Sequence, residues 1–331
     1  MTGVGVPASF ERYSSENPEY RSNDMVISSP TAEELTDVLH LAFAHLPERE
    51  LLARIDAMLI RFGLGVIPLD GVFQAKENGR LNGAFFSQSR SDGTTVLWPP
   101  VAPDQETYRE FFAVFERYCL QKAVKIAVML VDLQQQVDAE KLEEHGGFTF
   151  QSDLISLVCE TEKVVLPAYD PMLEFVSMTT ADGPEFANMA ELVHETYRNS
   201  RDFPGLVGVT PTNEVLRGYQ RETVFHPELW FFIRWGDEDV GTLLLADQSD
   251  GQMELIYMGL LEPYRNRGFA KEIIIKALET AKRWNRPLLL TSVDERNAAA
   301  VRAYLKQGFV AWDRKKVFAR FFQCIQSRRV S

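Results

Sequence analysis

The residues best suited to chemistry are the six of Arg265-Asn-Arg-Gly-Phe-Ala270. The run before them, 255–261, is apolar and β-prone, and Pro263 cannot continue a ladder, which predicts a strand. After them, apolar residues recur at the spacing of a buried helix face, at Ala270, Ile273, Ile274, Ala277, Leu278 and Ala281. A glycine-containing turn between a strand and a helix points free backbone N–H groups and the positive end of the helix dipole at one place.

The side chains of this turn also favour an anion. Arg265 and Arg267 add positive charge, and Gly268 has no Cβ to hold a phosphate away from the backbone. The sequence therefore predicts that a diphosphate binds to the turn.

Composition and charge exclude several classes of protein. The chain has 331 residues, which favours two domains over one, and no apolar run approaches the ~20 residues that span a bilayer. Residues 1–21 have neither the basic nor the apolar region of a signal peptide. The net charge of −12 weighs against a nucleic acid or an anionic membrane surface as a partner. We expect neither partner.

The cysteines indicate the compartment. Cys119, Cys159 and Cys324 are odd in number, far apart and without a CxxC pair. This usage is typical of a reducing environment and argues against a disulfide framework or a metal site. The expected location is the cytoplasm, and no metal is expected.

The elements that would position the turn follow a pattern that occurs twice. In the first half we expect a strand at 24–30, helices at 35–44 and 48–62, strands at 72–76, 81–87 and 94–98, a helix at 108–121, a strand at 125–131, a helix at 139–145 and a strand at 148–159. In the second half we expect a strand at 173–178, helices at 186–197 and 213–222, a hairpin of 229–234 and 240–246, the strand and helix around the turn, a strand at 288–293, a helix at 298–307 and terminal strands at 309–322.

The two halves align as an internal repeat of roughly 160 residues. For example, Lys125-Ile-Ala-Val-Met-Leu-Val-Asp132 aligns with Pro287-Leu-Leu-Leu-Thr-Ser-Val-Asp294. Other short matches keep the same order and a nearly constant offset. We therefore expect a loose lead-in at 1–22, a first domain at 23–160, a linker at 161–172 and a second domain at 173–331.

The turn resembles a known motif. Arg265-Asn-Arg-Gly-Phe-Ala270 fits the Gln/Arg-x-x-Gly-x-Gly/Ala loop of the Gcn5-related N-acetyltransferase (GNAT) superfamily. A second segment similar to the family follows at 288–309, with Asn297 and the ending Tyr304-Leu-Lys-Gln-Gly-Phe309. The resemblance covers about 175–322, and the first half looks like a second copy, a tandem arrangement similar to that of mycothiol synthase.

The resemblance implies an α/β (α+β) fold of two tandem GNAT-like domains, each a mixed, mostly antiparallel sheet flanked by helices. It also implies acetyl-CoA as the cofactor, wedged where two central strands splay apart. The implied cofactor-binding residues are Met258, Gly259, Leu260, Arg265, Asn266, Arg267, Gly268, Phe269, Ala270 and Asn297. Gly259 could instead be a packing glycine. Asn297 could be a helix N-cap, and its two roles could coexist.

Amine acetylation requires a deprotonated amine, a stabilised oxyanion and a protonated thiolate. By resemblance, Tyr304 matches the tyrosine that donates a proton to the thiolate, although it could also be a core aromatic residue. Glu254 lies fourteen residues before Gly268 and matches the base glutamate of the histone-acetylating members. The alternative is a solvent-facing glutamate at the start of a strand.

The first half departs from the family pattern. The segment that matches the diphosphate loop, Pro103-Asp-Gln-Glu-Thr-Tyr108, has no glycine and contains two carboxylates, and the position that matches Tyr304 falls near Glu143. Carboxylates repel a diphosphate. We therefore expect the first domain to be a degenerate, non-catalytic copy.

These features predict an acetyl-CoA-dependent N-acetyltransferase that acts on a primary amine of a small molecule by direct transfer in a ternary complex. A non-catalytic acyl-CoA-binding regulatory protein and a protein-directed acetyltransferase are the alternatives. The acceptor is not specified by the sequence, because acceptor residues are expected on variable loops such as 201–212.

Overall fold

The computed structural model describes residues 20–22, 25–65, 67–90, 92–167, 170–206, 208–222, 224–248 and 251–322. Internal contacts divide the chain into two compact units. Unit 1 consists of Met1–Phe150 and Lys316–Ser331, and unit 2 of Gln151–Lys315. Most of the expected lead-in, 1–22, lies outside the described residues, but Tyr20–Ser22 form the short strand β1.

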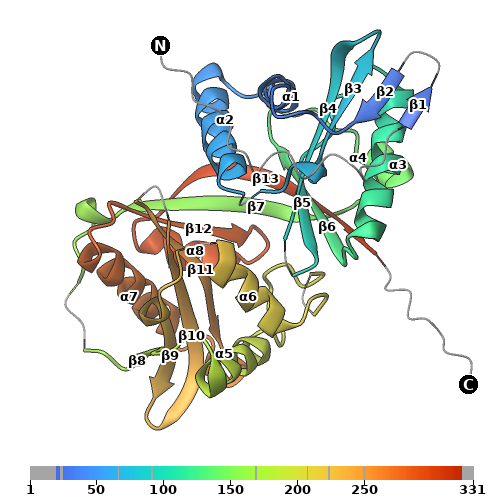
Figure 1. Ribbon diagram of the computed structural model, residues 1–331. Helices are drawn as coiled ribbons and strands as arrows, with labels where there is room; N and C mark the ends of the chain where they lie inside the picture. The colour runs from blue at the N-terminus through green and yellow to red at the C-terminus, as the bar shows by residue number, and fades with distance from the viewer. Residues whose placement is uncertain are drawn as a thin grey trace, which may run out of the picture. The chain divides into compact units, whose positions relative to one another are not determined.

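Unit 1 is a mixed sheet between two pairs of helices. The sheet order is β1-β2-β3-β4-β5-β6, and only β5 and β6 run parallel among these neighbours. The other strands are β2 Met25–Ser28, β3 Val72–Glu77, β4 Arg80–Ser89, β5 Thr94–Leu97 and β6 Ile126–Asp132. Figure 1 shows α1 (Leu35–Ala42) and α2 (Glu48–Gly63) on one side of β3 and β4, with α3 (Gln105–Gln121) and α4 (Ala139–Gly146) on the other.

Unit 2 repeats this design around the order β7-β12-β11-β10-β9-β8, in which only β11 and β12 run parallel. Its strands are β7 Thr149–Glu160, β8 Glu174–Ser177, β9 Trp230–Trp235, β10 Glu238–Asp247, β11 Met253–Leu260 and β12 Leu288–Asp294. The first part of β13 (Val310–Phe321) also belongs to unit 2. The expected mixed, mostly antiparallel sheets flanked by helices are confirmed in both units.

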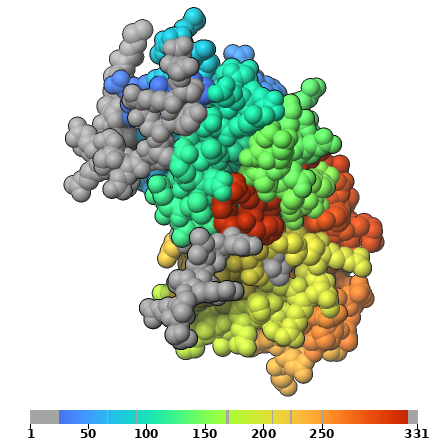
Figure 2. Space-filling view, turned by 90° about the vertical axis from the view of Figure 1, so that its right-hand side faces the viewer, coloured from blue at the N-terminus to red at the C-terminus, as the bar shows by residue number. Residues whose placement is uncertain are grey.

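Helices cover both faces of the sheet in unit 2. The helices are α5 Gly183–Thr196, α6 Thr212–Glu222, α7 Phe269–Arg283 and α8 Ala298–Lys306. Figure 1 shows α5 and α7 on opposite faces of β10 and β11. The outer surface of α5 and α6 is visible in yellow-green and yellow in Figure 2.

Helix α7 confirms the pattern that predicted it. Its apolar stripe is buried, with Ile274, Ala277 and Leu278 each 0% exposed in the core of the unit. Burying one such Ile or Leu side chain contributes roughly 1.5–3 kcal/mol. This packing fixes the start of α7, and therefore the turn at 265–268, against the sheet.

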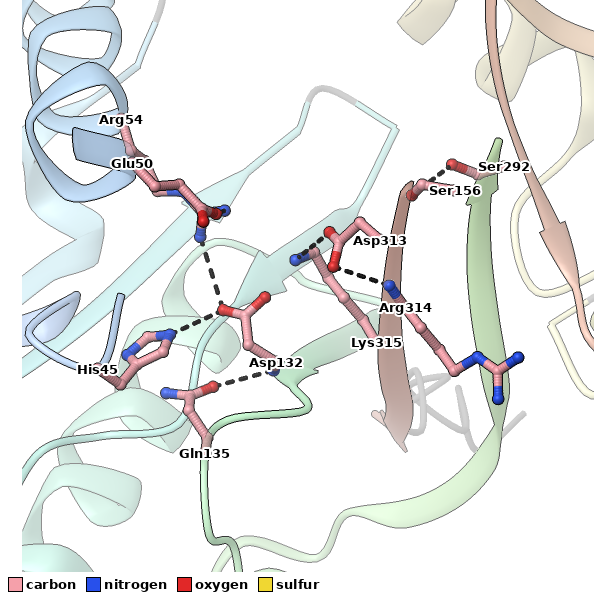
Figure 3. Close-up of polar contacts among 10 residues, drawn as sticks. All are labelled: His45, Glu50, Arg54, Asp132, Gln135, Ser156, Ser292, Asp313, Arg314 and Lys315. Atoms are coloured by element: carbon pink, nitrogen blue, oxygen red, sulfur yellow. Dashed lines mark hydrogen bonds and ion pairs between the residues drawn. The ribbon is translucent and has the colours of Figure 1, made fainter. Parts of the chain in front are cut away.

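The two halves of the sequence exchange strands. β7 follows the first half in sequence but pairs with β12 through seven antiparallel partners, from Leu288 with Glu160 to Asp294 with Leu154. A hydrogen bond between the Oγ atoms of Ser156 and Ser292, 3.3 Å apart, joins the same two strands (Figure 3). Conversely, β13 lies next to β6, and its last part contributes Phe318 to the core of unit 1.

This exchange determines where the units divide. The division falls at 150/151 and at 315/316, rather than at the expected linker of 161–172. The physical reason is that ladder hydrogen bonds and buried side chains of β7, such as Leu157, belong to unit 2. The expected terminal strands at 309–322 are one strand, β13.

Two further observations concern the described residues alone. None of their helices is long and apolar enough to cross a membrane. They contain no cluster of histidine, cysteine and carboxylate side chains that could hold a metal ion. Cys119 and Cys159 are free and buried, and Cys324 lies outside the described part of the chain.

Candidate acyl-transfer site in unit 2

A cavity opens where β11 and β12 separate. The two strands pair only at Met253 with Leu289 and at Glu254 with Leu290, whereas β11 remains paired with β10 as far as Leu260. The resulting cavity has a volume of about 620 Å³. It is lined by 255–260 of β11, 291–293 of β12, the turn before α7, the first turn of α8 and residues 199–202. Beyond Glu254, the backbone of β11 therefore has no ladder partner on the side of β12.

The turn before α7 has the geometry of an anion site. Gly268 is the N-cap of α7 with φ 86°, and no side chain caps the helix. A Cβ at Gly268 would meet no protein atom within 4 Å, so the backbone conformation, rather than crowding by the protein, requires glycine here. The N–H groups of the first turn of α7 consequently lack a side-chain acceptor and point toward the cavity end of the helix.

The two arginines of the turn are engaged by the protein itself. Arg265 donates to the carbonyls of Leu260, Asn199 and Thr196 at 2.8–3.1 Å, which ties the turn to the end of α5. Arg267 donates to the carbonyl of Pro263, stacks over Trp235 and does not line the cavity. Backbone groups therefore remain the main candidates for holding a phosphate, with the arginines supplying charge nearby.

Gly259 lines the cavity and is also required by packing. A Cβ there would lie 2.6 Å from Oγ1 of Thr196 and 2.7 Å from the hydroxyl of Tyr257. These two hydroxyls are hydrogen-bonded to each other at 2.7 Å. The packing interpretation of Gly259 thus holds, and it is compatible with a ligand on the free edge of β11.

Tyr304 lines the cavity and is also part of the core. The side chain is 4% exposed, and its ring lies 5.3 Å from that of Phe309. Its hydroxyl is hydrogen-bonded to the side chain of Thr291, which itself donates to the carbonyl of Leu255. Burial raises the pKa of Tyr304 above its ordinary value, and the charge of Asp202 raises it further. The phenol is therefore a neutral proton donor.

The two interpretations of Asn297, N-cap and cofactor contact, are compatible in the structure. Its side-chain oxygen accepts a hydrogen bond from the N–H of Ala300 at 3.3 Å, so it is the N-cap of α8. It also lines the cavity.

Of the remaining cofactor-binding candidates, Met258, Leu260, Asn266, Phe269 and Ala270 line the cavity as well. The structure thus gathers nine of the ten, Arg267 being the exception.

Glu254 is not brought into the cavity. It lies at the root of the gap between the strands, and Nε2 of Gln248 donates to its Oε2 at 2.5 Å. Asp202, which was not among the predicted site residues, lines the cavity from the loop between α5 and α6. The only signal was the expectation that acceptor residues lie on the 201–212 loop, which contains this single carboxylate.

Unit 1 has a different structure at the matching turn. Asp104 is the N-cap of α3, and its carboxylate accepts the N–H of Thr107 at 2.8 Å. This hydrogen bond lowers the pKa of Asp104, so the carboxylate is ionised at neutral pH. Glu143, at the position that matches Tyr304, is exposed. Helix α3 therefore presents its own negative charge where α7 presents uncapped N–H groups.

The aspartates at the ends of β6 and β12 are used alike in the two units. In unit 1, buried Asp132 lies 2.8 Å from Nε2 of His45, in the segment between α1 and α2 (Figure 3). In unit 2, buried Asp294 accepts the N–H of Phe203, in the segment between α5 and α6. Each aspartate thus holds the connection between the first two helices of its unit.

Comparisons with known proteins agree with this structure. Residues 192–309 match the model of the acetyltransferase (GNAT) family. A GCN5-related N-acetyltransferase from Sphaerobacter thermophilus has a similar structure over 91% of this chain and 96% of its own, with 15% identity and a TM-score of 0.63. A tandem GNAT protein from the clavulanic acid biosynthesis pathway is similar over 90% of this chain and 98% of its own, with 12% identity and a TM-score of 0.54.

A putative acetyltransferase from Pyrococcus horikoshii is similar over 94% of each chain, with 11% identity and a TM-score of 0.51. A search of curated proteins found no match. At these identities the solved structures show the fold alone, and they extend it over both units.

Proposed function

Because residues 192–309 match the model of the GNAT acetyltransferase family, we propose that the chain transfers an acetyl group from acetyl-CoA to a primary amine of a small molecule. The observation that carries this proposal is the cavity between β11 and β12. It joins an uncapped helix N-terminus, a strand edge without a ladder partner and a buried tyrosine hydroxyl. Direct transfer in a ternary complex fits a cavity that the acceptor and the cofactor would share.

The residues of unit 2 fit the parts of acetyl-CoA. The first turn of α7, with Gly268, would hold the diphosphate, because free N–H groups and the helix dipole favour negative charge there. The backbone of 258–260 would pair with the amides of the pantetheine arm. When bound, acetyl-CoA supplies an acetyl group activated as a thioester.

Tyr304 would hold a proton for the leaving sulfur. Its pKa is raised by burial, so it keeps that proton at neutral pH, and its hydroxyl is hydrogen-bonded to Thr291, which also lines the cavity. The sulfur leaves more readily when a general acid protonates it as the C–S bond breaks. General-acid contributions are typically 10²–10⁴-fold in rate.

We further propose that unit 1 does not bind a second acetyl-CoA. The carboxylate of Asp104 already accepts from the first turn of α3, and a diphosphate would meet that charge.

The proposal is tested by thiol release from acetyl-CoA with a panel of primary amines, including ethylamine, ethanolamine, spermidine and glucosamine. We expect thiol release that depends on the amine, with the N-acetylated amine as the product. Binding of acetyl-CoA without acetylation of any amine or protein would support the regulatory alternative. Acetylation of proteins alone would support the protein-directed alternative.

A further inference from the structure

The loop between α5 and α6 places a carboxylate in the cavity of unit 2. Asp202 lines the cavity together with Tyr257 of β11 and Tyr304 of α8. The N–H of Asp294 donates to Oδ1 of Asp202 at 2.9 Å, and Oδ2 of Asp294 accepts the N–H of Phe203 at 3.0 Å. These reciprocal hydrogen bonds fix the loop at the end of β12, so the position of Asp202 is set by the sheet.

Asp202 has no cationic partner among the described residues. Its Oδ1 accepts from Asp294, and no hydrogen bond of the described part of the chain uses Oδ2. The neighbouring Asp294, by contrast, is paired with Arg296 at 2.9 Å and accepts from Ser152. Asp202 is therefore a carboxylate in the cavity with one oxygen available to a ligand.

The groups around Asp202 come from four elements. They are the hydroxyls of Tyr197 at the C-cap of α5, Tyr257 on β11 and Tyr304 on α8, and the carboxylate of Asp294 on β12. Burial raises the pKa of Asp202. The hydrogen bond from the backbone N–H of Asp294 lowers this pKa, and the negative charge of the Asp294 carboxylate raises it. A carboxylate with a raised pKa is a stronger base than an exposed one.

We propose that Asp202 is the general base that accepts a proton from the acceptor amine. This inference rests on the proposed function. The acceptor enters as an ammonium ion; one N–H bond breaks, an O–H bond forms on Asp202, and the nitrogen lone pair forms the N–C bond to the acetyl carbon. The C–S bond breaks, and the thiolate takes the proton of Tyr304. The second proton lost by the nitrogen restores Tyr304, so one net proton leaves on Asp202.

The arrangement also selects a class of acceptor. A carboxylate without a cationic partner in a partly buried cavity favours ligands that arrive as cations. Acceptors with an ammonium group next to an apolar or hydroxylated body therefore suit the cavity better than acidic ones.

The test compares two amines of similar size but different basicity. Ethylamine is protonated at pH 7, whereas 2,2,2-trifluoroethylamine is largely neutral and needs no base to remove a first proton. Asp202→Asn retains an oxygen for the N–H of Asp294, so the loop keeps its anchor. Controls are Glu254→Gln, for the other candidate base, and Asp237→Asn, an exposed aspartate of the hairpin between β9 and β10.

For ethylamine, Asp202→Asn is expected to lower kcat/KM by at least ~10²-fold. In the unmodified protein, kcat/KM should rise with pH as the base ionises, and this rise should be absent in the variant. The affinity of the variant for acetyl-CoA should not change. The defect should be at least ~10-fold smaller for trifluoroethylamine, as expected when only proton removal is lost. Both controls should keep the rate of the unmodified protein.

Other results would overturn the inference. An equal defect for the two amines would show that Asp202 only positions the acceptor. An unimpaired Asp202→Asn together with a slow Glu254→Gln would assign the base to Glu254. Failure of the proposed function looks different, because the unmodified protein would then neither bind acetyl-CoA in calorimetry nor acetylate any amine, and the role of Asp202 would fall with it.

Thermal unfolding gives a readout without acetyl-CoA. Because the pKa of Asp202 is higher in the folded than in the unfolded chain, its ionisation disfavours folding at neutral pH. Asp202→Asn should therefore raise Tm at pH 7, and this gain should vanish as pH falls through the folded pKa toward the ordinary aspartate value. A lower Tm at pH 7 would show instead that the carboxylate is a structural anchor of the loop.

Discussion

The two interpretations of Tyr304 from the sequence, core aromatic residue and proton donor, are compatible in the structure. Its ring packs on Phe309 inside the core of unit 2, and its hydroxyl is hydrogen-bonded to Thr291, which lines the cavity as Tyr304 does. A buried tyrosine hydroxyl needs a polar partner, and the edge of a cavity supplies both the partner and access to a ligand. The same burial that packs the ring keeps the proton on the oxygen.

We expect Tyr304→Phe to lower kcat by ~10²-fold, the lower end of a general-acid contribution. The ring stays in place and Thr291 keeps its bond to the carbonyl of Leu255, so the affinity for acetyl-CoA and the Tm should change little. Steady-state kinetics with ethylamine, calorimetry and thermal unfolding measure these quantities. An unchanged kcat would remove Tyr304 from the mechanism.

Residue types and spacing predicted the part of the site that lies on regular elements. Gly268, Asn297 and Tyr304 all line the cavity because strand, turn and helix fix their places. Arg265 was predicted to add positive charge to the turn, but the sequence could not show that its donors are used by backbone carbonyls. Asp202 was missed because it lies on an irregular loop, where no periodicity shows which side chains point inward.

At the scale of elements, the turn before α7 depends on α5. The guanidinium group of Arg265 reaches the carbonyls of Thr196 and Asn199, which end that helix. Only a planar fork with several donors can bridge these carbonyls and that of Leu260 at once. Arg265 therefore holds the turn in the shape that leaves the first N–H groups of α7 uncapped.

We expect Arg265→Lys to lower the free energy of unfolding by about 1–2 kcal/mol, because a lysine cannot replace all three hydrogen bonds. The variant should also bind acetyl-CoA more weakly. Arg267→Lys is the matched control, since Arg267 makes one such bond and lies outside the cavity. Denaturant unfolding in which both variants behave alike would contradict this role.

The helices and strands themselves were largely predictable, because amphipathic spacing is a local property. The predicted helix at 48–62 appears as α2, and the predicted strand at 288–293 appears as β12. Helix α3 begins at Gln105, three residues earlier than expected, since Asp104 caps it before the apolar pattern becomes clear. The single strand β13 replaces the expected terminal strands because no turn interrupts it.

At the scale of the whole molecule, the strand exchange could not be read from local patterns. Alternating side chains predict that β7 and β13 are strands, but they do not specify the partner of either. The pairing with β12 is a long-range choice, and it buries Ile155, Leu157 and Cys159 in the core of unit 2. Sequence repeats therefore locate the two copies without locating their exact boundaries.

This exchange predicts the behaviour of truncated chains. A fragment of residues 166–331 lacks β7, which exposes the edge of β12 and removes three core side chains, so we expect it to be insoluble or unfolded. A fragment of residues 148–331 retains β7 and should fold better, as judged by circular dichroism and soluble yield. A stable, soluble 166–331 fragment with intact acetyl-CoA binding would contradict the importance of the exchanged strand.

The most direct test of the account is calorimetric titration of acetyl-CoA into Gly268→Asp. The aspartate places a carboxylate at the uncapped end of α7, as Asp104 does at α3, and should weaken binding by at least ~10²-fold, about 2.7 kcal/mol. Gly236→Asp is the matched control, because Gly236 also has a positive φ and open space around its Cβ position. The account predicts lost binding in the first variant and unchanged binding in the second. Unchanged affinity of Gly268→Asp would contradict it.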